Sequence, residues 1–322
     1  MDILLRLLAS VIADSAPLVF AAVGETINEK AGVINLSLDG SLMLAAMAGF
    51  AVAYSTGDVT LGFLAAMAVG ALVALIVAVS GITLKRDQVA VGFILSLLCT
   101  DLSSFLGTPF VRKPVITVPH APLPVLSGIP VVGPLFFDHN IMVYASFIVV
   151  FAAWFFMFKT QQGLLLQGVG ERPEAAFARG ANVQHLRYLY TLIGGALVGI
   201  GGAAFTLSAK PGWSYHHTQG FGWIALAIVI FGGWHPVRAA FGAYLFGALQ
   251  TLGSVLQSSL PDMPIYVFQV APFAFMIVVL LLTNSEGVNR LLDYLPRNLA
   301  RWINRMIRGQ APAALGTNFQ QE

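Results

Sequence analysis

Residues 59–82 read VTLGFLAAMAVGALVALIVAVSGI and contain no charged side chain. A helix that crosses a bilayer needs about 20 mostly apolar residues, so this stretch predicts a membrane-spanning helix. Four further stretches are uncharged and of similar length: Asn140–Phe158, Tyr188–Ala209, Ala239–Pro261 and Met263–Ser285. The 322-residue chain is 57% hydrophobic and 10% charged, whereas soluble domains carry about 25% charged residues. Composition and pattern therefore both indicate a membrane protein.

Four weaker segments complete the predicted transmembrane domain, residues 1–285. Residues 1–23 form a first span with a mobile start and not a cleaved signal, because Asp2, Arg6 and Asp14 interrupt the apolar run. The other three are Gly40–Gly57, which continues a segment begun near Leu36, Gln88–Val111 and the shorter Thr218–Trp234. We expect an all-α polytopic fold with about nine transmembrane helices, within a range of about eight to ten.

The basic residues predict the orientation of the chain, because lysine and arginine favour cytoplasmic loops. The long basic loop Lys159–Arg187 is assigned to the inside. Alternation of the spans then places Lys30, Lys85–Arg86, Arg238 and the arginine-rich tail inside, and leaves Arg6, Arg112, Lys113 and Lys210 outside. An odd number of spans puts the N-terminus outside, and a break within residues 15–40 would bring it inside. We expect a multi-pass protein of a bacterial inner membrane.

Residues 286–322 are predicted to form a cytoplasmic tail. Arg297, Arg301 and Arg305 recur every fourth residue, with apolar side chains on the opposite face. This spacing predicts a basic amphipathic helix over residues 290–308 that lies on anionic lipid. Residues 309–322 are expected to be disordered. At the other side of the membrane, seven prolines in residues 109–138 indicate a stiff lid over the helix ends, a docking surface for an extracytoplasmic partner, or both.

The chain lacks the patterns of an enzyme. No lysine follows a glycine in a phosphate-loop pattern, so the sequence predicts no ATP site of its own. His216 and His217 have no carboxylate at ligand spacing, and the single cysteine, Cys99, excludes an internal disulfide. A net charge of +2 gives no reason to expect a nucleic-acid partner. We expect no metal and no cofactor in this chain.

Two polar stretches carry the functional prediction. Residues 24–40 read GETINEKAGVINLSLDG, which favours an interrupted helix of the kind that forms transport sites; an ordinary cytoplasmic turn capped by Asp39 is the alternative. Residues 170–183 read GERPEAAFARGANV, in which Pro173 suits the start and Gly180 the end of a short cytoplasmic helix. The alternative there is a surface turn. The glycines of residues 194–202 predict a helix inside a tight bundle.

These stretches resemble a known family. The segment Glu25–Gly40 is similar to the permeases of the ribose, branched-chain amino acid and nucleoside group of ABC importers, and most similar to the nucleoside type that works with basic-membrane-protein-type lipoproteins. Glu174-Ala175-Ala176-x-x-x-Gly180 resembles the coupling loop of ABC permeases, although the later Ile-x-Leu-Pro part of that loop is missing. FGWIALA at 221–227 and FGGWHP at 231–236 resemble a late segment of the group.

The resemblance implies the partners and the coupling residues. It implies a cytoplasmic ABC ATPase that holds ATP and Mg, a second permease that is identical or homologous, and an extracytoplasmic substrate-binding lipoprotein. It also implies import of nucleosides or a related small polar solute. The residues expected to contact the ATPase are Glu171, Pro173, Glu174, Ala175, Ala176, Arg179 and Gly180.

Polar residues in apolar segments are the candidates for the solute pathway, because such groups need partners or water. They are Asn35, Ser37, Asp39, Gln88, Asp101, Gln250 and Gln257. Phe93 could stack on a base, with simple packing as the alternative. Two other functions stay open at this point. An ion-coupled secondary transporter would also use intramembrane acids, and a sugar or branched-chain amino acid ABC permease would share the family features.

Overall fold

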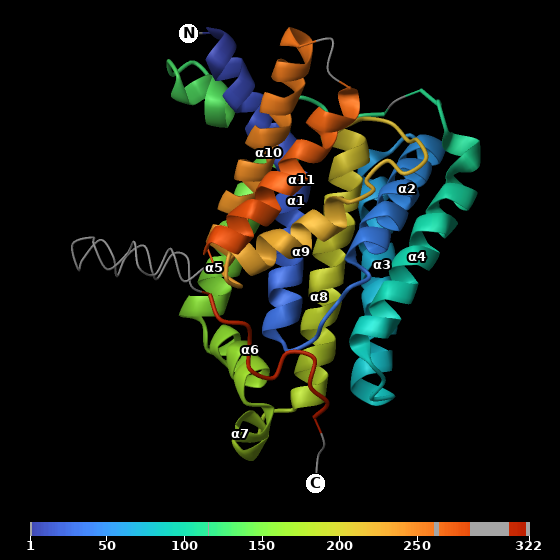
Figure 1. Ribbon diagram of the computed structural model, residues 1–322, viewed down its shortest axis with the longest axis vertical. Helices are drawn as coiled ribbons and strands as arrows, with labels where there is room; N and C mark the ends of the chain where they lie inside the picture. Colours follow the sequence, from blue (N-terminus) through green and yellow to red (C-terminus); the bar gives the residue numbers. More distant parts are fainter. Residues whose placement is uncertain (1, 115, 261–263, 284–308, 320–322) are drawn as a thin grey trace, which may run out of the picture.

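The computed structural model describes residues 2–114, 116–260, 264–283 and 309–319, and within these ranges it is helical with no strands (Figure 1). The α-helices are α1 (Asp2–Lys30), α2 (Leu38–Thr56), α3 (Val59–Ala78), α4 (Gln88–Gly107), α5 (Ile141–Lys159), α6 (Gln161–Glu171), α7 (Pro173–Ala178), α8 (Val183–Ala204), α9 (Phe221–Phe231), α10 (Pro236–Ser259) and α11 (Ile265–Thr283). Short turns of other helix types are η1 (Val79–Thr83), η2 (Thr108–Phe110), η3 (Gly133–Phe137) and η4 (Phe205–Ala209).

Seven helices in the described ranges are long and apolar enough to cross a membrane, namely α1, α2, α3, α4, α5, α8 and α10. The predicted count of about nine is not confirmed. Helix α9 is too short, because its 11 residues extend about 16 Å against a hydrocarbon core of about 30 Å. Glycines in the left-handed region, Gly220 before it and Gly233 after it, limit its length. Helix α11 lies in the predicted span Met263–Ser285, whose two ends fall outside the described residues.

Polar caps set the starts of several apolar helices. The Asp58 carboxylate accepts a hydrogen bond from Thr60 N at the start of α3, and Asp87 accepts from Ala90 N at the start of α4. The Asn140 and Asn182 side chains do the same for α5 and α8. These side chains satisfy backbone donors that a helix start leaves free. Helices α3, α4 and α5 begin within one residue of their predicted spans, whereas α8 begins five residues before its uncharged run.

Helix α8 packs in the centre of the bundle against α1, α2 and α3 (Figure 1). A Cβ atom placed on Gly194 would lie 2.6 Å from the carbonyl oxygen of Gly24 in α1, and one on Gly195 would lie 2.6 Å from that of Gly70 in α3. Only glycine permits backbones to approach this closely. The predicted tight packing of the glycine-rich helix is therefore confirmed.

Helix α1 extends beyond the predicted first span, residues 1–23, and includes the first part of the polar stretch 24–40. Helix α1 runs without interruption to Lys30, and the non-helical segment comprises residues 31–37. Buried polar side chains in the last turns of α1 find partners inside the bundle: Asn28 donates to Glu25 at 3.1 Å, and the Trp234 indole donates to Glu29. Gly32, with a φ of 86°, then allows the chain to leave the helix. The break therefore lies at residues 31–37, between α1 and α2 and inside the polar stretch 24–40.

The two ends of the bundle differ. The N-terminus, the loop after α4 and the loop before α9 lie at one end, whereas α6 and α7 lie at the other (Figure 1). Residues 309–319 also lie at the α6–α7 end, where main-chain hydrogen bonds hold them. The expected disorder is therefore wrong for 309–319, because small residues there pack closely against the bundle. The predicted amphipathic helix over 290–308 lies outside the described residues.

Candidate functional site

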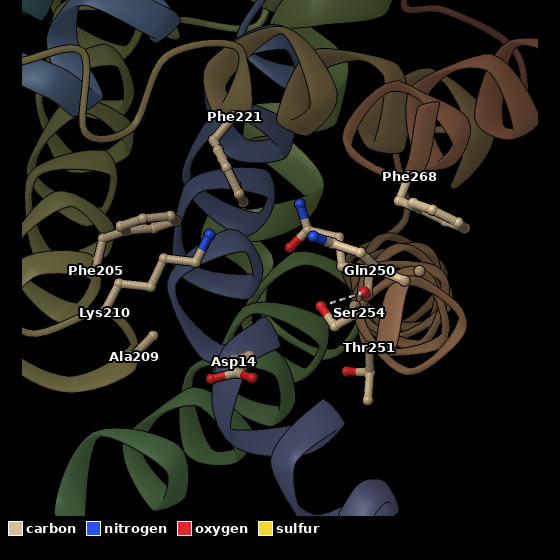
Figure 2. Close-up of a pocket in the computed structure, with 12 residues that line it drawn as sticks. Asp14, Phe205, Ala209, Lys210, Phe221, Gln250, Thr251, Ser254 and Phe268 are labelled. Carbon is tan, nitrogen blue, oxygen red and sulfur yellow. Dashed lines mark hydrogen bonds between the residues drawn. The ribbon is translucent and has the colours of Figure 1, made fainter. Parts of the chain in front are cut away.

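A cavity of about 270 Å³ opens between η4, α9, α10 and α11, with α1 at one side (Figure 2). We call it the aromatic cavity. Its lining residues are Asp14, Phe205, Ala209, Lys210, Phe221, Gly247, Gln250, Thr251, Gly253, Ser254, Gln257 and Phe268. Phe205 and Lys210 face the α10 residues across the space, and Phe221 projects between them (Figure 2). Ligand sites commonly combine apolar and aromatic walls with a few polar groups, as this cavity does.

Two phenylalanine rings and one lysine form one wall of the aromatic cavity. The ring centroids of Phe205 and Phe221 lie 4.5 Å apart at an interplanar angle of 74°, which is an edge-to-face contact. The Lys210 ammonium lies 5.5 Å from the first centroid and 5.2 Å from the second. A cation over an aromatic face is attracted by the ring quadrupole. The wall therefore offers both a π surface and a positive charge.

Lys210 and Asp14 place opposite charges at this cavity. Burial lowers the pKa of the Lys210 ammonium, and the nearby Asp14 carboxylate partly offsets the effect by favouring the charged form. Each charge therefore helps the other to stay ionised next to an apolar bundle. A solute in the cavity meets one cation and one anion, which suits a neutral polar molecule with both donors and acceptors.

The opposite wall comes from α10, where Gln250, Ser254 and Gln257 follow one another at helical spacing on the same face. The Ser254 hydroxyl donates to the Gln250 carbonyl oxygen at 3.1 Å, so this hydroxyl is held by its own helix. The side-chain amides of Gln250 and Gln257 line the cavity and can each donate and accept hydrogen bonds. The structure thus brings together two of the residues predicted for the pathway.

Four other predicted pathway residues lie at the break between α1 and α2, where they are buried and do not line the aromatic cavity. The Ser37 hydroxyl donates to Asn35 Oδ1, and the backbone amide of Ile34 donates to Gln88 Oε1 at 2.8 Å. Asp39 Oδ1 accepts from the amide of Gly222 at 2.9 Å, at the start of α9. These bonds fix the path of the chain through residues 31–37 and hold α9 against α2.

The remaining two predicted pathway residues lie on α4. Phe93 is 49% exposed, and the nearest described ring, that of Trp223, lies 6.3 Å away between centroids. Asp101 is also exposed. Neither lines the aromatic cavity. The structure therefore places these two residues on an outer face of the subunit.

Helix α7 corresponds to the short helix predicted in the loop before α8. Pro173 occupies its first turn, Glu174 follows, and Gly180, with a φ of 86°, ends the turn after it. Pro173 and Ala176 are buried against the bundle, whereas Glu171, Glu174, Ala175, Arg179 and Gly180 are exposed. A short helix is present at the predicted residues and presents polar and small residues at the surface, whereas its predicted position in the cytoplasm is not confirmed.

Sequence reasoning missed the charged and aromatic half of the cavity. Asp14 is a lone acid inside an apolar run, and Lys210 directly follows the uncharged stretch 188–209. Both positions are unfavourable in lipid, and this cost was an available signal for a functional site. Phe205 and Phe221 had no such signal, because they are two of 23 phenylalanines in an apolar chain.

Comparison with known proteins relates the chain to a family of transport proteins. Residues 7–280 match the family model for the branched-chain amino acid transport system permease component. A nucleoside ABC transporter permease of Lactococcus lactis is 32% identical over 88% of this chain and 96% of its own. A guanosine ABC transporter permease of Bacillus subtilis is 33% identical over 83% and 88%, and a putative glucose ABC transporter permease of Haloferax volcanii is 38% identical over 76% of each chain.

These relatives are transporter subunits and not enzymes. The family match spans the aromatic cavity, α7 and, apart from the first turn of α1, the seven helices of the described residues that are able to cross a membrane. The chain belongs to the branched-chain amino acid transport system permease family, and it is a multi-pass membrane subunit of an ABC importer.

Proposed function

We propose that this permease imports nucleosides. The observation that carries the proposal is the aromatic cavity, in which the rings of Phe205 and Phe221 face the amides of Gln250 and Gln257. A nucleoside offers a flat base that can stack on a ring and several groups that can bond to an amide. Two similar proteins bear the names of a nucleoside and a guanosine permease, and they support the same solute class.

A sugar is the second candidate, because a relative that is 38% identical is named as a putative glucose permease. A sugar would use the hydrogen-bonding wall of α10 and the charges of Asp14 and Lys210, but it lacks a planar base. The two solutes therefore differ in how much they depend on the ring wall. The Lys210 ammonium lies over the rings of Phe205 and Phe221, so a base that stacks on them would take over this position.

The other parts of the proposal follow from the ends of the bundle. The basic loops and α7 would lie in the cytoplasm of a bacterial cell, at its inner membrane, where the exposed residues Glu171, Glu174, Ala175, Arg179 and Gly180 would meet an ABC ATPase. That ATPase would hold the ATP and Mg. A substrate-binding lipoprotein would deliver solute to the opposite end, near residues 109–138, and a second permease would complete the pair. Lysine and arginine at the α7 end support this sidedness.

The test is uptake by the complete importer in proteoliposomes, with ATP inside and labelled guanosine outside together with the receptor lipoprotein. Excess unlabelled glucose serves as the competitor. We compare the wild-type chain with Gln250→Leu and with the control Gln161→Leu, which makes the same change at an exposed position on α6. Loss of an amide partner for a polar solute is expected to lower kcat/KM about tenfold.

The expected result is ATP-dependent guanosine uptake that glucose does not inhibit, that falls in Gln250→Leu and that is unchanged in Gln161→Leu. Uptake that glucose suppresses completely would favour the sugar candidate. Equal uptake by both variants would remove the aromatic cavity from the solute pathway.

A further inference from the structure

Residues 309–319, GQAPAALGTNF, form an extended segment across the α6–α7 end of the bundle (Figure 1). We call this segment the C-terminal strap. It contains no charged residue and consists largely of small side chains. Pro312, Ala314 and Phe319 are buried, so the strap is a packed part of the subunit. Its contacts connect elements that are distant in sequence.

The first part of the strap is bonded to the end of α6 and to the segment that follows α1. The Ala314 amide donates to the Gly170 carbonyl oxygen at 2.9 Å, and the Ala313 amide donates to the Glu171 carboxylate at 3.2 Å. Two residues later, the Gly316 amide donates to the Gly32 carbonyl oxygen at 3.0 Å. Residues 313–316 of the strap are therefore bonded both to Gly32, at the start of the α1–α2 break, and to Glu171, two positions before α7.

Arg187 in the first turns of α8 depends on the same segment. Its side chain is 2% exposed, and Nη1 donates to the Thr317 carbonyl oxygen at 2.9 Å. Its Nε and Nη2 are buried and have no hydrogen-bond partner among the described residues. A buried cation is costly unless it is hydrogen-bonded. The strap therefore supplies the hydrogen-bond acceptor that the structure shows for this arginine.

The last part of the strap reaches α7 itself. Phe319 is 6% exposed, and its ring centroid lies 5.7 Å from that of Phe177 on α7. The Asn318 side chain donates to the Lys85 carbonyl oxygen in the loop before α4 at 3.3 Å. The last described residue of the strap, Phe319, thus contacts α7, in addition to the strap contacts at Gly32 and Arg187.

Two glycines make this fit possible. Gly316 has a φ of 73°, and a Cβ atom there would lie 2.6 Å from Cδ1 of Ile34, within the α1–α2 break. Gly309 lies against Gly233, so that a Cβ on it would lie 1.8 Å from the Gly233 Cα. A larger residue at Gly309 would collide with the Gly233 backbone, and one at Gly316 would push against the Ile34 side chain in the α1–α2 break.

We propose that the C-terminal strap is a mechanical link that transmits movement of α7 to the α1–α2 break. This inference rests on the proposed function of α7 as the ATPase contact. A segment that is hydrogen-bonded at Gly170 and at Gly32 cannot follow one of them without pulling on the other. The break is in turn bonded to α4 through Gln88. Asp39, in the first turn of α2 directly after the break, is bonded to α9, which begins at a residue of the aromatic cavity, Phe221.

The test uses the full importer with Gly316→Val and the matched control Gly57→Val. Gly57 also has a positive φ, of 75°, but no atom lies within 4 Å of a Cβ placed there. Both variants therefore carry similar backbone strain, and only the first disturbs the contact between the strap and Ile34 of the α1–α2 break. The measurements are the amount of chain in the membrane, the ATPase that co-purifies, ATP hydrolysis and solute uptake.

We expect Gly316→Val to keep its ATPase and its ATP hydrolysis but to lose solute uptake per ATP on the order of fivefold, with Gly57→Val close to wild type. Equal coupling in the two variants would overturn the proposal. If Gly316→Val is depleted from the membrane, Phe319→Ala replaces it, because this change frees the strap only from α7. Wild-type uptake per ATP in Phe319→Ala would then overturn the proposal. A wild-type chain that binds no ATPase would refute the proposed function instead.

Discussion

The α1–α2 break and the aromatic cavity are both polar regions inside an apolar bundle, yet they differ in where their polar groups point. At the break, Asn35, Ser37 and Asp39 bond to protein groups. At the cavity, the amides of Gln250 and Gln257 face open space. A polar side chain in a membrane segment is costly in lipid in either case. The location of its hydrogen-bond partner distinguishes a group that holds the fold from one that is free to bind a solute.

The comparison divides the predicted pathway residues into distinct groups. Gln250 and Gln257 stay candidates for solute contact. Asn35, Ser37, Asp39 and Gln88 hold the chain where the strap also bonds, so their effect on transport would come through the position of α9 and α4. Phe93 and Asp101, on the outer face of α4, belong to neither region. Two experiments test this division, and a third tests a buried histidine outside both regions.

The largest effect is expected for Asp39→Leu, which removes the acceptor at the start of α9. Buried amides would lose a charged partner, and the free energy of unfolding should fall by about 2–4 kcal/mol. The matched control is Asp101→Leu, the same change at an exposed position. Thermal unfolding in detergent, monitored by size-exclusion chromatography, measures the difference in stability between the two variants. Equal stability of the two variants would show that the bond from Gly222 to Asp39 does not hold the fold.

An intermediate effect is expected for Phe221→Leu at the aromatic cavity. Loss of a stacking face should raise KM for a nucleoside about fivefold while leaving competition by a sugar unchanged. The control is Phe93→Leu, because this ring is exposed on α4. Uptake kinetics are compared at matched amounts of folded protein, since Phe221 also packs against Phe246. A larger change in KM for Phe93→Leu would move the base-binding surface to α4.

The smallest effect concerns His235, whose Nδ1 is buried without a hydrogen-bond partner in the described structure. Burial, Arg238 and Lys30 lower the pKa of His235 from 6.5 to about 4. Between these pH values the unfolded chain binds a proton that the folded chain does not, so stability is lost as pH falls through this window. His235→Phe keeps a ring next to Phe158 and should flatten the fall in melting temperature between these pH values.

His120→Phe, at an exposed histidine bonded to Asp138, is the control for that experiment. Its melting temperature is measured over the same pH range. If both variants melt with the wild-type pH dependence, the acid sensitivity comes from other groups.

Local patterns predicted much of the fold. Uncharged runs located most of the spanning helices, and proline and glycine located α7, because these signals act within a few residues. Predictions that needed distant partners were less successful. The predicted first span ends at residue 23, whereas α1 continues to Lys30, because Asn28 and Trp234 donate hydrogen bonds to its buried glutamates. Residues 309–319 read as a disordered tail because their partners, Gly32, Gly170 and Arg187, are more than 100 residues away in the sequence.

The sequence by itself determined that the chain lies in a membrane, that α8 packs closely and that a short helix precedes it. Hydrophobic length and glycine spacing are sufficient for this, since lipid leaves few alternatives to a helix. Only the tertiary structure decided which polar residues are satisfied by protein and which face a cavity. It also brought Asp14 and Lys210, from opposite halves of the chain, to the same cavity. Hydrogen bonds and charges act over a few ångströms in space, and a sequence does not record which distant residues come that close.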